Sequence, residues 1–277
     1  MFCHFAKTCL KFHRRYEKIS NRMVGWSLDM RLIRSKMKKS SLVVLSLAIA
    51  GAASARDLYS SEDHPGTPLE LGIATPVQIP PANWSVYGLR LNLIYGESYD
   101  VYGLDLGLVG YNRDKMVGLQ MMAAADWVES DMDGVQFAGI ANVVCGNAAG
   151  IQFGGIVNYT RGDFAGVQFA AINFDGTFYG FQAGMFNYDK GISWGLQLGL
   201  ANAAVNEFHG WSIAAVNYAE RMHGLHLGLI NLAAESGRGV QIGVFNGASR
   251  YNGIQIGLLN VIGNGELPIM PVLNARF

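Results

Sequence analysis

The sequence is poor in cysteine, in charge and in long apolar runs, and each shortage excludes a class of protein. Of three cysteines, Cys3 and Cys9 lie near the start and Cys145 stands alone in the rest of the chain. A single cysteine forms no intramolecular disulfide, which excludes the framework of small disulfide-rich exported domains. No apolar run reaches the roughly 20 residues of a membrane-spanning helix, and no helix-period pattern follows residue 55. We therefore expect an all-β chain.

The segment 1–55 differs from the remainder of the chain in charge. It holds 11 of the 21 Lys and Arg but 2 of the 21 Asp and Glu, which leaves 10 positive and 19 negative charges, a net of −9. A basic stretch, the apolar run 42–50 and Ala53-Ser54-Ala55 form the pattern of a cleaved secretory signal. We predict an upstream extension over 1–36, a signal peptide over 37–55 and one β domain over 56–277. The acidic domain argues against nucleic acid as a partner, because such binding rests on basic patches.

A repeat with a period of about 15 residues dominates the chain after residue 85. Each unit carries one glycine at the same place, and the interval between successive glycines is nearly constant. This period leaves room for about ten residues of strand and about five of turn, which is too short for a pair of helices. The repeat glycines are Gly88, Gly103, Gly118, Gly134, Gly150, Gly166, Gly180, Gly195, Gly210, Gly224, Gly239 and Gly253.

Within each unit the residues alternate between two characters. The first and third residues after the glycine are apolar in all 12 units, and the second is polar in all of them. Such alternation predicts a strand with a bulky apolar face and a narrow face of Gln and Gly. We predict that the polar residues line an interior, with a structural or pore role: Arg90, Asp105, Gln120, Gln136, Gln152, Gln168, Gln182, Gln197, Ser212, His226, Gln241 and Gln255.

Two architectures use such a repeat, and we favour an antiparallel transmembrane β-barrel. The 12 units, with further strands at 69–76 and 268–277, make 14, and bacterial barrels have even strand counts. About nine residues of strand, tilted by about 45°, span roughly 21 Å, close to the apolar band of an outer membrane. Large aromatics near the strand ends resemble interfacial girdles. In this barrel the apolar face meets lipid and the amides point inward.

The alternative is a parallel β-solenoid, in which each unit is one coil. Its apolar positions stack inside, while Gln and Asn form ladders outside or at the corners. Two observations favour it: the gaps do not alternate between short turns and long loops, and apolar residues such as Ile140, Ile156 and Phe186 accompany the Gln side. In the barrel, antiparallel neighbours place the central polar residues of successive units opposite one another. We therefore predict that Arg90 and Asp105, in consecutive units and of opposite sign, are cross-strand neighbours on the interior face, where pairing makes a buried charge tolerable.

The unit GφQφGφφN, where φ is apolar, runs through Gly88 to Asn260 and precedes the ending LPIMPVLNARF. This pattern resembles bacterial surface-repeat proteins over most of the chain after residue 55. Several units depart from it: GLRLNLIY has Arg and no final Asn, GLQMMAAA lacks the second Gly, and GWSIAAVN has Ser in place of Gln. The resemblance implies export and a place at the surface or outer membrane, and it implies no reaction.

The sequence offers little for catalysis or metal binding. His209, His223 and His226 are the only late histidines, and their spacing matches no compact zinc motif, so we expect polar lining at His226 and rim positions for the others. The turn acids are explained by Asx-turn geometry, and DMDG at 131–134 lacks the later Glu of a calcium loop. No GxSxG or phosphate-binding loop occurs.

We therefore expect no catalytic residues, no cofactor and no metal. The predicted function is a non-enzymatic protein of the outer membrane or cell surface, with the lipid bilayer as partner and a passive pore or structural role. The alternative is a secreted β-solenoid that binds surfaces in the manner of an adhesin.

Overall fold

The computed structural model describes residues 64–277, so the predicted boundaries at 36 and 55 lie outside the described part of the chain. These residues form one sheet of 17 strands without a helix. Accordingly, no helix between residues 64 and 277 has the length and hydropathy to cross a membrane.

The strands follow one another in chain order with short connections. They are β1 (Gly66–Ala74), β2 (Val77–Ile79), β3 (Ser85–Ser98), β4 (Val101–Asn112), β5 (Met116–Val128), β6 (Met132–Ala138), β7 (Ala141–Val144), β8 (Ala148–Gly154), β9 (Val157–Phe169), β10 (Ile172–Ala183), β11 (Phe186–Asp189), β12 (Ile192–Leu198), β13 (Ala201–Ile213), β14 (Val216–Leu227), β15 (Ile230–Ala248), β16 (Tyr251–Ile262) and β17 (Ile269–Arg276).

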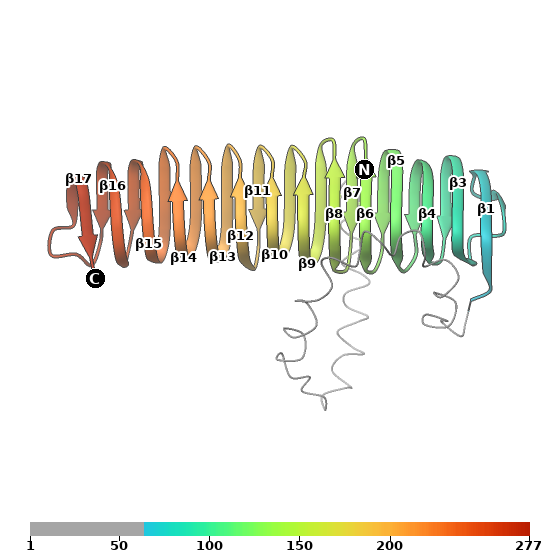
Figure 1. Cartoon of the computed structure of the whole chain (residues 1–277), viewed down its shortest axis with the longest axis horizontal. Coiled ribbons are helices and arrows are strands. Elements are labelled where there is room, and N and C mark those ends of the chain that lie inside the picture. Colours follow the sequence, from blue (N-terminus) through green and yellow to red (C-terminus); the bar gives the residue numbers. More distant parts are fainter. Residues whose placement is uncertain (1–63) are drawn as a thin grey trace, which may run out of the picture. The chain divides into compact units, whose positions relative to one another are not determined.

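The strand directions show that the prediction of an antiparallel barrel is wrong. From β3 to β16 every strand pairs in parallel with the corresponding strand of the next unit, and the chain forms a β-solenoid of about 13 turns (Figure 1). Antiparallel pairing occurs at the two ends, where β1 pairs with β2 and β17 covers β16. The predicted strand at 268–277 therefore exists, but it caps a stack of coils and does not close a cylinder.

Each coil has two straight limbs joined by two bends. We call the segment around the repeat glycine the Gln limb, exemplified by β8, and the segment around an Asn seven or eight positions later the Asn limb, exemplified by β7 and β11. The register is strict, because Gly150 pairs with Gly166 and Gln152 with Gln168, and the same holds along the stack. Like residues therefore lie above like residues, at the spacing of about 4.8 Å between neighbouring strands.

The repeat glycine is required by the closeness of successive coils. All 12 repeat glycines have a positive φ, such as 124° at Gly150, and a Cβ there would lie 1.9 Å from the carbonyl oxygen of Gly134 in the preceding coil. A side chain at this position would be strained and would also separate the coils. The interval between repeat glycines in the sequence is thus the number of residues in one coil.

The polarity of the coils is opposite to that assumed for the solenoid alternative. The amides of both limbs point inward and are buried, whereas the bulky apolar residues of the repeat point outward. Buried apolar side chains form two smaller clusters inside the coils, on the side that precedes the repeat glycine. One lies around Val101, Met116 and Phe164 and the other around Phe208, Met222 and Ile262. The prediction that amides face inward and aliphatic residues outward agrees with the structure, although the cylinder around which it was drawn does not exist.

Candidate functional site

The predicted interior-lining residues stack into one row inside the Gln limbs. Every one of the twelve is at most 2% exposed, so their side chains fill the interior and line no open lumen. The Nε2 group of each Gln donates to Oε1 of the Gln in the preceding coil. The distance is 2.8 Å from Gln136 to Gln120, from Gln152 to Gln136 and from Gln168 to Gln152, and the row continues through Gln182 to Gln197. An amide carries both donors and an acceptor, so identical side chains satisfy one another in a parallel stack. The row therefore fills the interior of the described coils and leaves no open channel along it.

A second row of amides runs along the Asn limbs and was not predicted as a set of site residues. Its hydrogen bonds are continuous from Asn142 to Asn260, with 2.8 Å between Asn231 Nδ2 and Asn246 Oδ1 as a typical distance. Asn231 also donates across the coil to the carbonyl of Ile242 at 2.9 Å. Each such Asn thus links two coils and two limbs. A small residue three or four positions before the Asn makes room for its side chain: a Cβ on Gly154 would lie 2.6 Å from Asn158 Oδ1.

The predicted pairing of Arg90 with Asp105 is confirmed, in a parallel register. The two residues are partners across β3 and β4, both side chains are fully buried, and Arg90 Nε donates to Asp105 Oδ1 at 2.7 Å. Arg90 also reaches Ser98 Oγ and the carbonyl of Tyr111, while Asp105 accepts from Gln120. The pair begins the amide row and leaves neither charge without hydrogen bonds, which is the condition for tolerating buried ions.

Two departures from Gln interrupt the same row further along. Ser212 turns to the Asn row and donates to Asn217 Oδ1 at 2.7 Å. His226 is 1% exposed, its Nδ1 has no partner, and burial lowers its pKa to about 3, so its imidazole is neutral. This interior position agrees with the polar lining expected for His226.

Two carboxylates separate the apolar clusters of the interior. Asp175 and Asp189 are both 0% exposed, and they accept hydrogen bonds from neighbouring Gln side chains, such as 2.7 Å from Gln182 to Asp175. Burial raises the pKa of Asp189 to about 7, and burial together with the charge of Asp189 raises the pKa of Asp175 well above its usual value. The pair therefore holds a proton near neutral pH, because two adjacent buried charges would repel each other.

The outer surface divides sharply between two bends. The apolar bend joins the Gln limb of a coil to its Asn limb, and the two residues at its centre are Gly or apolar in all 12 coils. Many of these side chains are well exposed, including Leu200 at 53%, Leu229 at 59% and Leu258 at 73%. The bends comprise 93–94, 107–108, 123–124, 139–140, 155–156, 170–171, 184–185, 199–200, 214–215, 228–229, 243–244 and 257–258.

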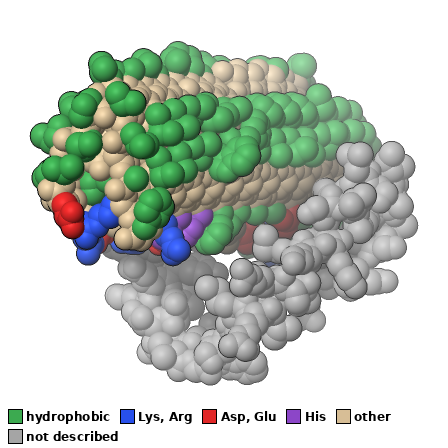
Figure 2. Space-filling model, turned by 60° about the vertical axis from the view of Figure 1, so that its left-hand side comes forward, with side chains coloured by type: hydrophobic (Ala, Val, Ile, Leu, Met, Phe, Trp, Pro, Cys, Tyr) green, Lys and Arg blue, Asp and Glu red, His purple; other side chains and the backbone are tan. Residues whose placement is uncertain are grey.

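The opposite polar bend joins each Asn limb to the next coil and carries the charge. Between residues 85 and 262, every charged side chain that is not buried lies in a polar bend or within two residues of one. Examples are Arg113, Asp163, Lys190 and Arg250. Figure 2 shows rows of hydrophobic side chains over the broad surface, with the charged and histidine side chains gathered along one edge. The solenoid is thus amphipathic across its width.

Tyrosine and tryptophan occupy the level between these two surfaces. Eight of them lie two or three residues from a polar bend on the outer side of either limb: Tyr102, Tyr111, Trp127, Tyr159, Tyr179, Tyr188, Trp194 and Tyr218. The outward row nearest the apolar bend on the Gln limbs, from Leu91 to Ile256, contains neither type. These eight residues therefore form a belt beside the polar bends, whereas Trp211 lies closer to the apolar bend and Tyr251 is buried in the interior.

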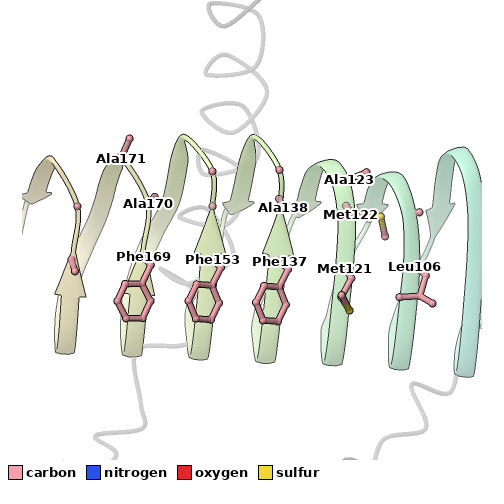
Figure 3. A pocket seen from close by; sticks show the side chains of 16 residues that line it. Leu106, Met121, Met122, Ala123, Phe137, Ala138, Phe153, Phe169, Ala170 and Ala171 are labelled. Carbon is pink, nitrogen blue, oxygen red and sulfur yellow. The ribbon is translucent and has the colours of Figure 1, made fainter.

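A shallow groove of about 1000 Å³ follows the Gln-limb face next to the apolar bend. Phe137, Phe153 and Phe169 stack in a row along it, with ring centroids 4.8 and 4.9 Å apart (Figure 3). Small residues such as Ala138 and Gly155 form the adjoining part of its wall. The groove has an almost wholly apolar lining and crosses several coils.

Comparison with known proteins gives no relative: no protein-family model, no curated protein and no solved structure matches this chain. The likeness to bacterial surface-repeat proteins stays a prediction from the repeat pattern. The fold and the surface together define a class of protein: a parallel β-solenoid with rows of buried amides inside and apolar side chains outside.

Proposed function

We propose that this protein is a non-enzymatic, exported solenoid that binds a lipid surface through its apolar bends and the limb faces beside them. The observation that carries the proposal is the separation of the two bends, one without a polar residue at its centre in any of the 12 coils, the other holding the exposed charges. Contiguous apolar surface of this extent marks a membrane or protein interaction site.

The order of side chains across the coil favours lipid over a second protein. From apolar bend to polar bend the outer surface passes through mainly aliphatic and Phe side chains, then the Tyr and Trp belt, then charges. The same order is found from the hydrocarbon of a bilayer through its interface to water, and Tyr and Trp are enriched at that interface. A flat contact with another chain would cover one limb face and leave the bend and the other face in water.

Binding of this kind needs no single strong contact. Burying one Leu side chain contributes about 1.5–3 kcal/mol, and the strict register repeats such a side chain coil after coil. With the Tyr and Trp belt at the membrane interface, the apolar bend and the limb faces beside it are immersed, and the polar bend stays in water. The acyl chains would then fill the groove beside Phe153. The secretory signal expected at 37–55 supports a place at the cell surface or outer membrane.

The test is flotation of the protein, purified in the form that the cell leaves after processing, with vesicles of zwitterionic phosphatidylcholine. The triple variant Leu200→Glu, Leu229→Glu and Val244→Glu adds three negative charges to exposed bend positions. The matched control, Arg113→Gln, Lys190→Gln and Arg250→Gln, makes the net charge more negative by the same amount but at the polar bends. We expect the parent protein and the control to float and the bend variant to stay in the dense fraction.

A second measurement reports on the depth of insertion. Trp194 belongs to the belt, whereas Trp211 lies one outward position closer to the apolar bend and is 60% exposed. Lipids brominated deep in their acyl chains should quench Trp211 more than Trp194. Flotation of the bend variant equal to that of the control, or a parent protein that stays unbound in the presence of vesicles and forms dimers instead, would reject lipid as the partner.

A further inference from the structure

A cluster of three metal-ligating side chains lies on the Gln-limb face near the polar bend, and it plays no part in the proposed lipid contact. Glu207 and His209 belong to β13, and His223 belongs to β14. His209 and His223 are register partners, so two histidines from consecutive repeat units stand side by side on adjacent coils. No metal was expected here from the sequence, because this spacing matches no motif within one segment.

The donor atoms converge on one point. Glu207 Oε1 lies 2.8 Å from His209 Nε2 and 3.4 Å from His223 Nε2, and all three donors are within 4.8 Å of one another. Zinc binds imidazole nitrogen and carboxylate oxygen at about 2.0–2.2 Å, so neighbouring donors in a tetrahedral site are roughly 3.3–3.5 Å apart. The Glu207–His223 distance of 3.4 Å lies in this range, while the Glu207–His209 distance of 2.8 Å is shorter and would lengthen on binding. His223 is the most exposed of the three side chains, at 40%, and has room to rotate.

The surroundings hold the ligands in place and leave them available. Trp194 stacks on His209 with the rings 3.9 Å apart and 7° from parallel, which fixes that imidazole. Arg221 approaches the other carboxylate oxygen, Glu207 Oε2, at 3.6 Å and is also bonded to Glu235 and Asn206. Oε1 faces the two imidazole nitrogens, so a cation bound between the three atoms would replace these contacts. The histidines and Glu207 are 22 to 40% exposed, so an ion has access and a fourth position stays open to water.

We propose that Glu207, His209 and His223 form a site for a borderline divalent transition metal, of which Zn²⁺ is the representative. Two nitrogen donors and one oxygen donor suit Zn²⁺ and its neighbours in the first transition row better than Mg²⁺ or Ca²⁺, which take oxygen ligands. The ion would join two adjacent coils at the aqueous edge of the solenoid. This inference does not depend on lipid binding, and either can fail alone.

The experiment is calorimetric titration of the full chain with Zn²⁺, supported by the visible absorption of added Co²⁺ as a readout of coordination. The variants are His209→Ala, His223→Ala and Glu207→Gln. The matched control is His64→Ala, which removes a histidine in ring contact with Tyr99, many coils away from the cluster. We expect the parent and the control to bind one more equivalent of zinc than the double variant His209→Ala/His223→Ala. Each single variant should weaken that equivalent at least about tenfold.

Thermal unfolding supplies a second readout, since a ligand that binds the folded state raises its stability. Zinc should raise the melting temperature of the parent and of the control but not of the double variant. If the double variant binds the same number of equivalents with the same affinity, or if the parent gains no cobalt absorption, the cluster is an ion-pair network and the proposal is wrong.

Discussion

The inside and the outside of this solenoid have exchanged the roles that they have in most soluble proteins. Much of the interior is built from amide and charged side chains at or near 0% exposure, beside the two smaller apolar clusters, whereas residues such as Leu229 and Leu258 stand more than half exposed. A buried amide costs free energy unless it is hydrogen-bonded, and a stack of identical coils supplies that partner at every step. The comparison teaches that strict register can replace apolar packing as the source of specificity in a core.

The Arg90–Asp105 pair is the place where an interior change should cost most. Replacing Arg90 by Met leaves Asp105 buried without its cation, and we expect a loss of about 3–5 kcal/mol in the free energy of unfolding. The double variant Arg90→Met/Asp105→Asn should regain much of this loss, because Asn keeps the acceptor for Gln120. Urea titration followed by circular dichroism measures both. Equal destabilisation of the single and double variants would show that the charge pair is not what matters.

The Asn row should respond less than this pair, and more than any outer position. Asn231→Ala removes the acceptor of Asn217 and the donor to Ile242, and leaving such groups unpaired costs about 1–3 kcal/mol. Its matched control is Leu229→Ala in the adjoining apolar bend, where an exposed side chain is lost and the change should stay within about 0.5 kcal/mol. A larger effect at Leu229 than at Asn231 in the same urea titration would reverse the assignment of inside and outside.

The smallest effect that we expect is the change in folding stability with pH. The folded-state pKa of Asp189, about 7, lies above its unfolded value near 4, so the folded state binds the extra proton between these limits. Stability from this group is therefore greatest below about pH 4 and is lost as the pH rises towards 7. His226, whose folded pKa is lowered to about 3, acts in the opposite direction below pH 6.5.

Asp189→Asn isolates the contribution of the carboxyl pair from that of His226. The parent should lose more melting temperature than Asp189→Asn between pH 5 and pH 8, with Asp163→Asn at an exposed polar bend as the control. An identical pH profile for parent and Asp189→Asn would show that the buried pair does not hold the proton.

The sequence predicted the repeat, the two faces and the Arg90–Asp105 contact, because these follow from residue alternation alone. It did not predict strand direction. The block around Gln152 reads nearly the same forwards and backwards, so it fits parallel and antiparallel neighbours equally well. Two features of the sequence do favour parallel coils: the nearly uniform interval between repeat glycines, and the Asn that follows each glycine by seven or eight positions in most units and marks the second limb.

The candidate surface was harder to predict than the interior rows. Extending the alternation through Ile140 and Ile156 places them on the Gln side, whereas they lie in bends where the alternation stops. The cluster of Glu207, His209 and His223 was missed because its members meet only when one coil lies on the next. Proximity of this kind depends on the period of the stack and on no local motif.

The reversed direction of β17 has a consequence for the edge that the stack presents. A parallel stack offers the same edge at each step, and a bare end would accept a further copy of the chain just as it accepts a further coil. Because β17 runs against β16, the last row of backbone groups no longer matches the pattern of the first coil of another molecule. β17 thus presents to another chain an edge that differs from the edge that each repeat presents to the next.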